Sequence, residues 1–330
     1  MNILIITPAP PGSSAGNRAT AERWAQLLGA EGHQVRVETR FDGQPCDLVM
    51  ALHAWRSHGD IVKVRHQFPD MPLVLALTGT DIYDHQHRFP ESTLESMDLA
   101  DSLIGLHRLV DQDIPQRFRD KLVTVLQSAL APGEPSDWDS ADNASGQPFL
   151  VSVIGHLRDE KDPLRAALAA RELPGDSAIR IVAAGRAHNQ EWADRARQEQ
   201  RENARFRWAG ELGQQATQDL LLGSRLMVIS SVMEGGANVV SEACRAGIPI
   251  IASDIPGNRG LLGAGYPGYF PAGDESALAE LLVRAEQQPE FLASLQAQVA
   301  ARAADFTPEK EQASLLQAID LALKNFTHPG

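Results

Sequence analysis

Two glutamates eight residues apart, Glu234 and Glu242, are the side chains of this chain best placed to do chemistry. An apolar run, 225–231, precedes them, a helical pattern follows, and the turn between them consists of Gly235, Gly236, Ala237 and Asn238. A strand, a glycine-rich turn and a helix N-terminus together leave backbone N–H groups for an anion. A helix rises about 1.5 Å per residue, so residues 236–242 span roughly 9 Å, about the distance from a diphosphate to the ribose of a nucleotide. Glu242 would then accept from ribose hydroxyls and Glu234 from those of an attached sugar; the alternative is a solvated loop glutamate beside a helix-terminal one.

A second group of polar residues follows the apolar run 149–154. His156 and Lys161 are expected in a loop that begins with Gly155 and leads into the next helical pattern. Lys161 can act as a point charge on a diphosphate that gains negative charge as it leaves. His156 can do so only when protonated or when donating as a neutral ring, because its unperturbed pKa is about 6.5. We predict catalytic roles for Lys161, His156 and Glu234, the alternative being a surface loop of mixed charge.

Polar residues also follow three apolar runs in the first half of the chain. Small residues precede Arg18, where a backbone can approach a ligand closely and the guanidinium can pair with a phosphate-like oxyanion. This stretch is not a G-x-G-x-x-G fingerprint, which argues against a nicotinamide cofactor. Capping or turn roles are the alternative for part of the group. The predicted acceptor-binding residues are Gly16, Asn17, Arg18, His53, Arg56, Thr78, Thr80 and Asp81, and His107 occupies a similar place.

A metal site is not expected. No Cys/His cluster has zinc spacing, and the segment 81–87, with Asp81, Asp84, His85 and His87, is interpreted as a polar loop. No cofactor is expected either.

Short apolar runs alternate with amphipathic stretches, the pattern of a parallel α/β fold. Strands are expected at 3–6, 35–38, 48–51, 73–77, 102–105 and 122–125, and again at 149–154, 179–183, 206–208, 226–229 and 248–252. Helices are expected at 18–30, 61–67, 164–171, 191–202, 214–222, 239–246 and over most of 274–324. The prediction is two doubly wound, Rossmann-like domains, with ligands at the carboxyl ends of the strands. The domains are 1–131 and 149–305, the segment 132–148 is a linker rich in Pro, Gly, Ser and Asp, and a helix in 306–330 packs back on the first domain.

Composition excludes several function classes. The chain has 330 residues, a net charge of −13 and a pI near 5.2, which argues against nucleic-acid partners and against docking on an anionic membrane. No window approaches the roughly 18 apolar residues of a membrane span, and the N-terminus lacks the features of a signal peptide. The two cysteines are far apart, so we expect a reducing, cytoplasmic location.

These residues together resemble the GT-B glycosyltransferases, in particular glycosyltransferase family 4. Glu234 to Glu242 is similar to that family's E-x7-E signature, and the downstream Ala-Gly-Ile-Pro-Ile-Ile-Ala-Ser also agrees. The resemblance implies that Glu234 contacts the donor sugar, Glu242 the ribose, and Lys161 the diphosphate. The chain departs from the family at two places: His156 stands where the family has Arg, and Thr78 where it has His.

A narrower resemblance comes from Ser-Ala-Gly-Asn-Arg at 14–18, Leu-His-Ala at 52–54, Leu-Thr-Gly-Thr-Asp at 77–81 and Gly-His-Leu-Arg-Asp at 155–159. This pattern is similar to the selenosugar synthases of selenoneine biosynthesis. It implies UDP-N-acetylglucosamine as the donor, selenophosphate as the acceptor, and coupling to a selenophosphate-producing enzyme. A small, highly charged acceptor needs cations, which Arg18 with His53 or Arg56 can supply.

Two other functions stay open at this point. An ordinary family 4 enzyme would transfer a hexose to a hydroxyl acceptor, and a non-catalytic subunit would bind the nucleotide sugar without consuming it. The presence of both Glu234 and Glu242 favours an enzyme.

Overall fold

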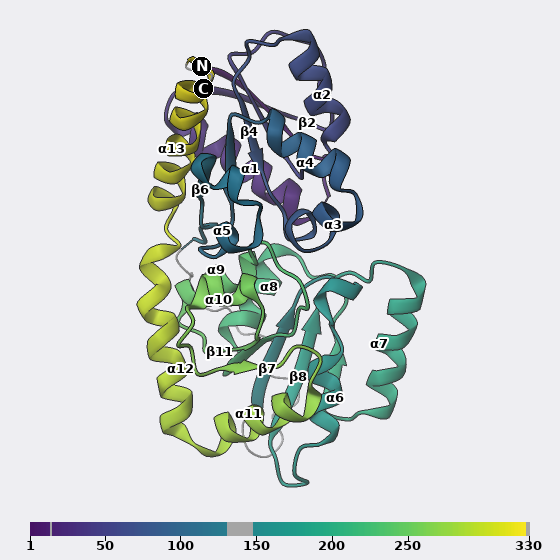
Figure 1. The fold of residues 1–330 in the computed structure, drawn as a ribbon. Helices are drawn as coiled ribbons and strands as arrows, with labels where there is room; N and C mark the ends of the chain where they lie inside the picture. The colour runs from purple at the N-terminus through teal and green to yellow at the C-terminus, as the bar shows by residue number, and fades with distance from the viewer. Residues whose placement is uncertain (14, 131–147, 328–330) are drawn as a thin grey trace. The chain divides into compact units, whose positions relative to one another are not determined.

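The computed structural model describes residues 1–13, 15–130 and 148–327. These residues form two compact units (Figure 1). The first unit comprises Met1–Ser128 together with Thr307–Gly330, and the second comprises Ala129–Phe306. The expected linker at 132–148 lies outside the described residues, apart from Pro148.

A six-stranded parallel sheet forms the centre of the first unit. Its order is β2-β1-β3-β4-β5-β6, and the strands are β1 (Asn2–Ile6), β2 (Gln34–Glu38), β3 (Leu48–Leu52), β4 (Leu73–Ala76), β5 (Ser102–Gly105) and β6 (Leu122–Thr124). Strands β3, β4 and β5 are buried at every residue. Both faces of a parallel sheet are covered by helices, which is why these strands are nearly continuous apolar runs.

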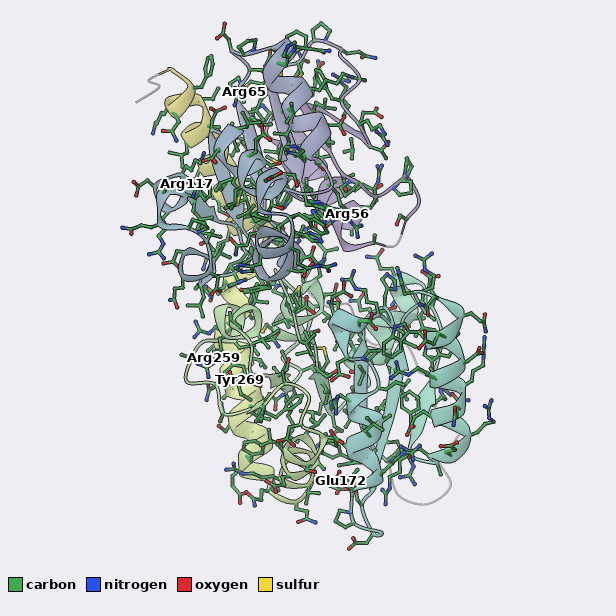
Figure 2. The ribbon with its side chains drawn as sticks, turned by 45° about the vertical axis from the view of Figure 1, so that its right-hand side comes forward. Arg56, Arg65, Arg117, Glu172, Arg259 and Tyr269 are labelled. Atoms are coloured by element: carbon green, nitrogen blue, oxygen red, sulfur yellow. The ribbon has the colours of Figure 1, made fainter. Side chains whose placement is uncertain are left out.

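Helices cover the two faces of this sheet separately. Its helical elements are α1 (Gly16–Ala30), α2 (His58–Gln67), η1 (Asp81–His85), α3 (Gln86–Arg88), α4 (Pro90–Leu99), α5 (Val110–Asp113), η2 (Gln116–Lys121) and α13 (Pro308–Thr327). On one face Trp24 and Leu28 of α1 pack with Leu315 and Ile319 of α13, all at most 1% exposed. On the other face Ile61 of α2 belongs to a second core cluster. Arg65 of α2 (Figure 2) places Nη2 2.8 Å from Asp101 Oδ2 and so ties this helix to the start of β5.

A buried glutamate fastens the last helix to the first unit. Glu311 of α13 is fully buried. Its carboxylate accepts hydrogen bonds from Trp24 Nε1–H (2.7 Å), Arg23 Nε–H (3.0 Å) and the Ser128 N–H (2.8 Å). A buried charge is stable only when it is paired and hydrogen-bonded, and Glu311 meets both conditions with partners 183 or more residues away in the chain.

The second unit has the same layered plan. Its parallel sheet has the order β12-β11-β10-β7-β8-β9, with strands β7 (Phe149–Ile154), β8 (Ile179–Ala184), β9 (Phe206–Trp208), β10 (Leu226–Ile229), β11 (Ile250–Ser253) and β12 (Tyr269–Phe270). Its helical elements are η3 (Asp159–Lys161), α6 (Arg165–Arg171), α7 (Gln190–Glu202), α8 (Gln214–Leu222), α9 (Asn238–Ala246), α10 (Pro256–Leu262), α11 (Glu275–Gln287), α12 (Pro289–Arg302) and η4 (Ala303–Asp305). Side-chain caps begin two of them: Asn189 accepts from Trp192 N–H (2.9 Å) at α7, and Asp274 accepts from Ala277 N–H (2.9 Å) at α11.

The predicted α/β class is confirmed, and each expected strand is present within two residues of its predicted ends. Eight elements were not predicted: the helical elements η1, α3, α4, α5, η2, η3 and α10, and the two-residue strand β12. Among the described residues, no helix has the length and apolar character needed to cross a membrane.

Candidate functional site

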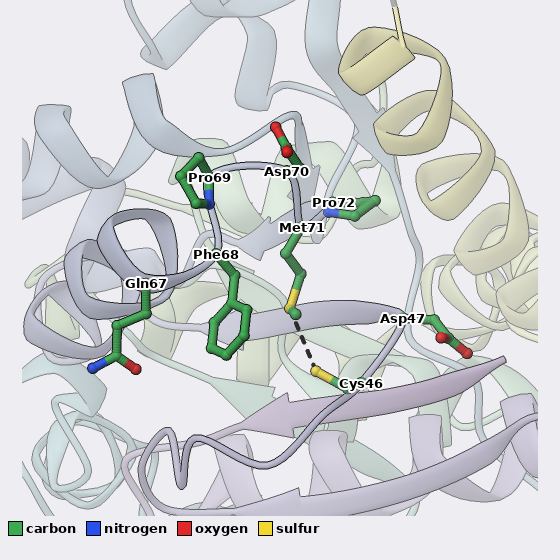
Figure 3. A pocket seen from close by; sticks show the side chains of 8 residues that line it. All are labelled: Cys46, Asp47, Gln67, Phe68, Pro69, Asp70, Met71 and Pro72. Carbon is green, nitrogen blue, oxygen red and sulfur yellow. Dashed lines mark hydrogen bonds between the residues drawn. The ribbon is translucent and has the colours of Figure 1, made fainter.

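A pocket of about 360 Å³ lies at the amino ends of β3 and β4 (Figure 3). Its lining includes Cys46, Phe68 and Met71, with Cys46 Sγ 3.4 Å from Met71 Sδ. Burial raises the pKa of the Cys46 thiol, which keeps it protonated. Ligands of open α/β sheets bind at the carboxyl ends of the strands, so this pocket lies at the opposite edge from the one expected to be functional.

The predicted residues instead lie at the carboxyl ends, next to the point in each sheet where strand order reverses. In the second unit this point falls between β7 and β10. His156 and Lys161 follow β7, and Glu234 follows β10. In the first unit it falls between β1 and β3, which Arg18 and His53 follow. Neighbouring loops diverge at such a point and leave room for a ligand between them.

Lys161 and Glu234 form an ion pair through Nζ and Oε1. The glutamate side chain is only 7% exposed and the lysine 21%. Ser231 Oγ donates to the same carboxylate oxygen (2.6 Å), and the Val232 N–H donates to the Glu160 carbonyl (3.0 Å). The loops after β7 and β10 are therefore bonded to each other, and they hold a cation and an anion at the end of the sheet.

Close backbone contact holds His156 beside the end of β8. Its Nδ1 accepts from the Arg186 N–H (3.3 Å), which favours the tautomer with the proton on Nε2. Gly185 has a φ of +152°, and a Cβ there would lie 2.0 Å from the Gly155 carbonyl oxygen. Only glycine fits this crossing of two loops.

The turn at Gly235–Ala237 leads directly into α9, which starts at Asn238. Ala237 cannot cap the helix through its side chain, so the positive end of the helix dipole is not offset at that position. Glu242 lies on the second turn of α9 and is exposed, whereas Glu234 is buried.

Sequence reasoning did not identify the residues behind Glu234. The Asn258 amide donates to the Ser253 carbonyl (2.9 Å), and Ser253 Oγ donates to the Ser231 carbonyl. The Glu234 backbone is also held, because a Cβ at Gly257 would lie 2.3 Å from the Glu234 carbonyl oxygen. The Ile-Pro-Gly-Asn stretch at the start of α10 is the sequence feature that could have indicated these residues. It does not predict their buried contacts with Ser253 and Glu234.

Arg18 lies near the start of α1 and is 92% buried, with 8% of its surface exposed. Its Nε–H donates to Glu22 Oε1 (2.6 Å). Within the described part of the chain, Nη1 is buried without a hydrogen-bond partner. A buried guanidinium N–H group without a partner is costly, and an anion bound there would remove the cost.

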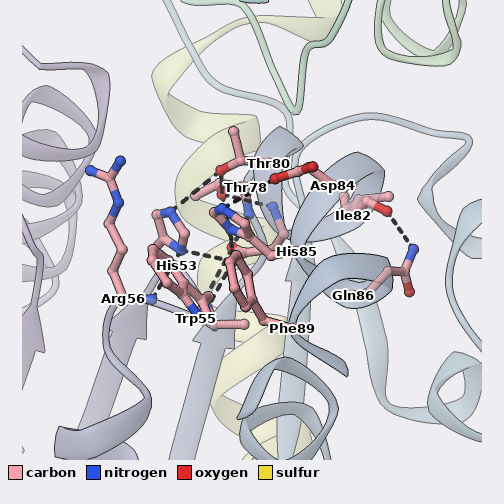
Figure 4. Close-up of polar contacts among 12 residues, drawn as sticks. His53, Trp55, Arg56, Thr78, Thr80, Ile82, Asp84, His85, Gln86 and Phe89 are labelled. Atoms are coloured by element: carbon pink, nitrogen blue, oxygen red, sulfur yellow. Dashed lines mark hydrogen bonds and ion pairs between the residues drawn. The ribbon is translucent and has the colours of Figure 1, made fainter. Parts of the chain in front are cut away.

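The loops after β3 and β4 carry a cluster of polar side chains that includes His53, Thr78 and Thr80 (Figure 4), and Asp81 bonds to both loops. Asp81 Oδ1 lies 2.7 Å from His53 Nδ1, and Oδ2 accepts from Ala54 N–H (3.0 Å) and from Thr78 Oγ1 (2.8 Å). Burial raises the pKa of Asp81, but the neighbouring side chains of His53 and His85 and the charge of His53 outweigh it and hold this pKa below its usual range. Asp81 is therefore ionised and fixed within the protein.

The other predicted residues of this region divide into two groups. Thr80 Oγ1 lies 3.3 Å from His53 Nε2 and so belongs to the same cluster. Arg56 donates through its backbone N–H to His53 Nδ1 (3.3 Å), while its guanidinium points away from the cluster. The structure adds His85, whose ring lies 5.3 Å from that of His53 between centroids.

His107 has a different role. The Leu109 N–H donates to its Nδ1 (3.2 Å), which leaves the proton on Nε2, 2.9 Å from the Tyr83 hydroxyl. Tyr83 in turn donates to Asp113 (3.0 Å). Burial lowers the pKa of His107 to about 4, although Asp111 raises it. This histidine is neutral and its ring nitrogens are occupied.

The family model described as "Glycosyl transferases group 1" matches residues 136–303, more than half of the chain. The chain belongs to this family. The match spans both loops that carry the Lys161–Glu234 pair.

Solved structures share the fold over nearly the whole chain. Anabaena Alr3699/HepE, in complex with UDP, is 18% identical, covers 97% of this chain and 100% of its own, and has a TM-score of 0.77. Sucrose-phosphate synthase from Thermosynechococcus elongatus is 16% identical, covers 98% of both chains, and has a TM-score of 0.80. Trehalose-6-phosphate synthase OtsA is 11% identical with a TM-score of 0.74, covering 97% of this chain and 99% of its own. These likenesses confirm the predicted GT-B fold class.

Proposed function

We propose that this glycosyl transferase uses a UDP-sugar, UDP-N-acetylglucosamine, as donor, and selenophosphate as acceptor, so that the product is a selenosugar. The donor would bind to the second unit and the acceptor to the first. The observation that carries the donor assignment is the Lys161–Glu234 pair at the reversal point of the second sheet, next to the uncapped start of α9.

The second unit has the chemistry that a nucleotide diphosphate sugar needs. Lys161 supplies a positive charge, and the backbone of Gly235, Gly236 and Asn238 precedes or opens a helix whose dipole favours an anion. Glu234 is an ionisable acceptor for sugar hydroxyls, and Glu242 is an exposed one for the ribose. HepE, with the same fold, has been solved with UDP, which supports the choice of nucleotide.

Arg18 supports a small anionic acceptor. Its guanidinium, whose Nη1 has no partner among the described residues, lies in the first turn of α1, and this turn contains no acidic residue. The positive end of the helix dipole and the positive side chain therefore both favour an anion here. A phosphate-type oxyanion would satisfy Nη1, whereas a neutral hydroxyl acceptor would leave the positive charge less well compensated.

The proposed reaction is one displacement. A lone pair of the acceptor selenium forms a bond to the anomeric carbon, the bond from that carbon to the diphosphate oxygen breaks, and UDP leaves with the electron pair. The bond from selenium to phosphorus stays intact in this step, so the immediate product is a selenosugar that carries the phosphoryl group on selenium. Selenium in this acceptor is already a strong nucleophile, so the protein's contribution is positioning and stabilisation of the leaving charge by Lys161 and the start of α9. No divalent metal is needed for this step.

The test is to incubate the protein with UDP-N-acetylglucosamine and selenophosphate and to follow UDP and the selenosugar by mass spectrometry. Orthophosphate at the same concentration is the matched control, since it has a similar shape and charge but a weaker nucleophile. We expect UDP release that depends on selenophosphate. UDP release that selenophosphate does not change would refute the acceptor assignment, and release stimulated by a sugar hydroxyl would favour ordinary hexosyl transfer.

The donor assignment has a separate test. Glu242→Ala should weaken UDP binding in isothermal titration calorimetry by about 10-fold, the loss expected for one or two hydrogen bonds. Unchanged UDP affinity in this variant would show that the nucleotide does not lie along α9.

A further inference from the structure

We propose that His53, Asp81 and His85 form a binding site for a divalent transition-metal ion in the first unit, with zinc as the reference case. This inference does not rest on the donor and acceptor proposed above, although His53 and Asp81 are also among the predicted acceptor-binding residues. Each residue offers one ligand atom, and these atoms all lie within 4.8 Å of one another. The three residues are 2%, 1% and 8% exposed, so the cluster is an interior feature.

The local fold brings the three groups together from two loops. His53 directly follows β3 and has a left-handed backbone, with a φ of +75°, which turns its side chain back over the end of the sheet. Asp81 and His85 are the first and last residues of the π-helix η1. A π-helix has more residues per turn than an α-helix, so residues four apart lie almost directly above one another, and such turns are frequent at functional sites.

The distances agree with a metal site. Two imidazoles bound at about 2.0–2.1 Å in tetrahedral geometry have ring centroids roughly 5 Å apart. The His53 and His85 centroids are 5.3 Å apart. Ligand atoms of such a site are separated by roughly 3.3 Å. The distances from Asp81 Oδ1 to the Nδ1 atoms of His53 and His85 are 2.7 and 3.8 Å, on either side of this value.

An unpartnered nitrogen is the independent sign of a ligand. His85 Nδ1 is buried and has no hydrogen-bond partner among the described residues. It faces Asp81 Oδ1 at 3.8 Å, too far for a hydrogen bond and close enough for both atoms to bind one ion. His53 Nδ1 lies 2.7 Å from the same oxygen and also accepts a long hydrogen bond from the Arg56 N–H (3.3 Å). Two ring nitrogens and one carboxylate oxygen therefore surround one small volume.

The outer ring nitrogens have the partners that metal-bound histidines usually have. His85 Nε2 lies 3.4 Å from Asp84 Oδ2, and His53 Nε2 lies 3.3 Å from Thr80 Oγ1. A carboxylate or hydroxyl on the far nitrogen fixes the tautomer and the ring orientation. Asp81 is held in the same way, since its Oδ2 accepts from Ala54 and Thr78, and its Oδ1, which faces the histidines, also accepts from the Trp55 N–H (3.1 Å).

The charges also suit a cation. Asp81 is ionised, and Asp84 lies behind His85 and pairs with the exposed Arg88 at 3.4 Å. Two neutral imidazoles and one carboxylate are a ligand set of zinc and similar ions, and three protein ligands leave a further position for water or an anion.

The experiment measures metal binding by the full chain, without an affinity tag, after treatment with EDTA. Zn²⁺ is titrated calorimetrically into the wild type, His85→Gln and His87→Gln. His87 is the matched control because it lies two residues away on the surface. We expect one high-affinity zinc in the wild type and in His87→Gln, and at least 100-fold weaker binding in His85→Gln.

A spectroscopic measurement on the wild type covers the case in which His85→Gln does not fold. Co²⁺ in a site with three protein ligands should give the visible absorption of a four- or five-coordinate ion, and Zn²⁺ should abolish it. A wild-type spectrum of fully hydrated Co²⁺, or equal zinc affinity in the wild type and both variants, would overturn the proposal. In that event His53 and Asp81 are a hydrogen-bonded pair without a metal.

Discussion

Replacing Glu311 by alanine should destabilise the first unit strongly. The carboxylate is fully buried and accepts from Trp24, Arg23 and the Ser128 backbone. Removing it leaves three buried donors without partners, namely Trp24 Nε1–H and the N–H and Oγ–H of Ser128, at about 1–3 kcal/mol each, and it removes the counter-charge of Arg23. The free energy of unfolding should therefore fall by about 4 kcal/mol. For domains of this size about 1 kcal/mol corresponds to roughly 2–4 °C, which gives a decrease in Tm on the order of 10 °C.

Thermal unfolding followed by differential scanning calorimetry measures this effect, and Glu309→Ala is the matched control. Both glutamates lie in the first turn of α13 and contribute equally to the helix dipole, but Glu309 is exposed. Glu311→Gln keeps the size and one acceptor oxygen, so we expect a loss about half as large. Equal Tm values for Glu311→Ala and Glu309→Ala would show that the buried hydrogen bonds do not fasten α13.

Three further predictions concern the two units. Gly257→Ala should lower transferase activity about 100-fold, because its Cβ would push the Glu234 backbone by roughly an ångström. Gly265 has open space around it, so Gly265→Ala is the control and should be neutral in the same assay. Similar activities of the two variants would contradict the role given to Gly257. Burial lowers the pKa of His107 in the folded protein to about 4, whereas the unfolded chain binds this proton already near pH 6.5. The free energy of unfolding should therefore fall by about 3 kcal/mol as the pH decreases from about 6.5 to about 4. In urea titrations His107→Gln should lose less stability than the wild type over this pH range. Identical pH profiles of the two proteins would show that His107 is not the source of the pH dependence. Arg18→Ala should leave UDP affinity unchanged and raise the KM for selenophosphate at least 10-fold; a loss of UDP binding alone would place this arginine on the donor side.

The strands were predictable because their signal is local. Burial on both faces of a parallel sheet requires a continuous apolar run, and Leu48–Leu52 and Leu226–Ile229 are such runs. The candidate residues could be located because polar residues directly after such runs must lie at the carboxyl edge. Lys161 and Glu234 are the clearest instance, since their ion pair joins two loops 73 residues apart.

The remaining features depend on contacts that have no local signal. The π-helix at Asp81–His85 has too few apolar residues for any periodicity, so its segment reads as a polar loop. His85 becomes a candidate ligand only through its proximity to His53, which lies on another loop. Gly257 is a second example. A side chain is excluded there by the close Glu234 backbone, which is distant in sequence, and not by the conformation of its own turn.

The discontinuous first unit imposes an order on biosynthesis. Its sheet and α1 leave the ribosome early, but Leu315, Ala318, Ile319 and Ala322, which cover one face of that sheet, are made only after the whole second unit. The second unit is continuous in the chain and can fold while synthesis is still in progress. Throughout that interval the nascent first unit exposes the apolar surface around Trp24 and Ile104, until α13 packs on it and Glu311 accepts its hydrogen bonds.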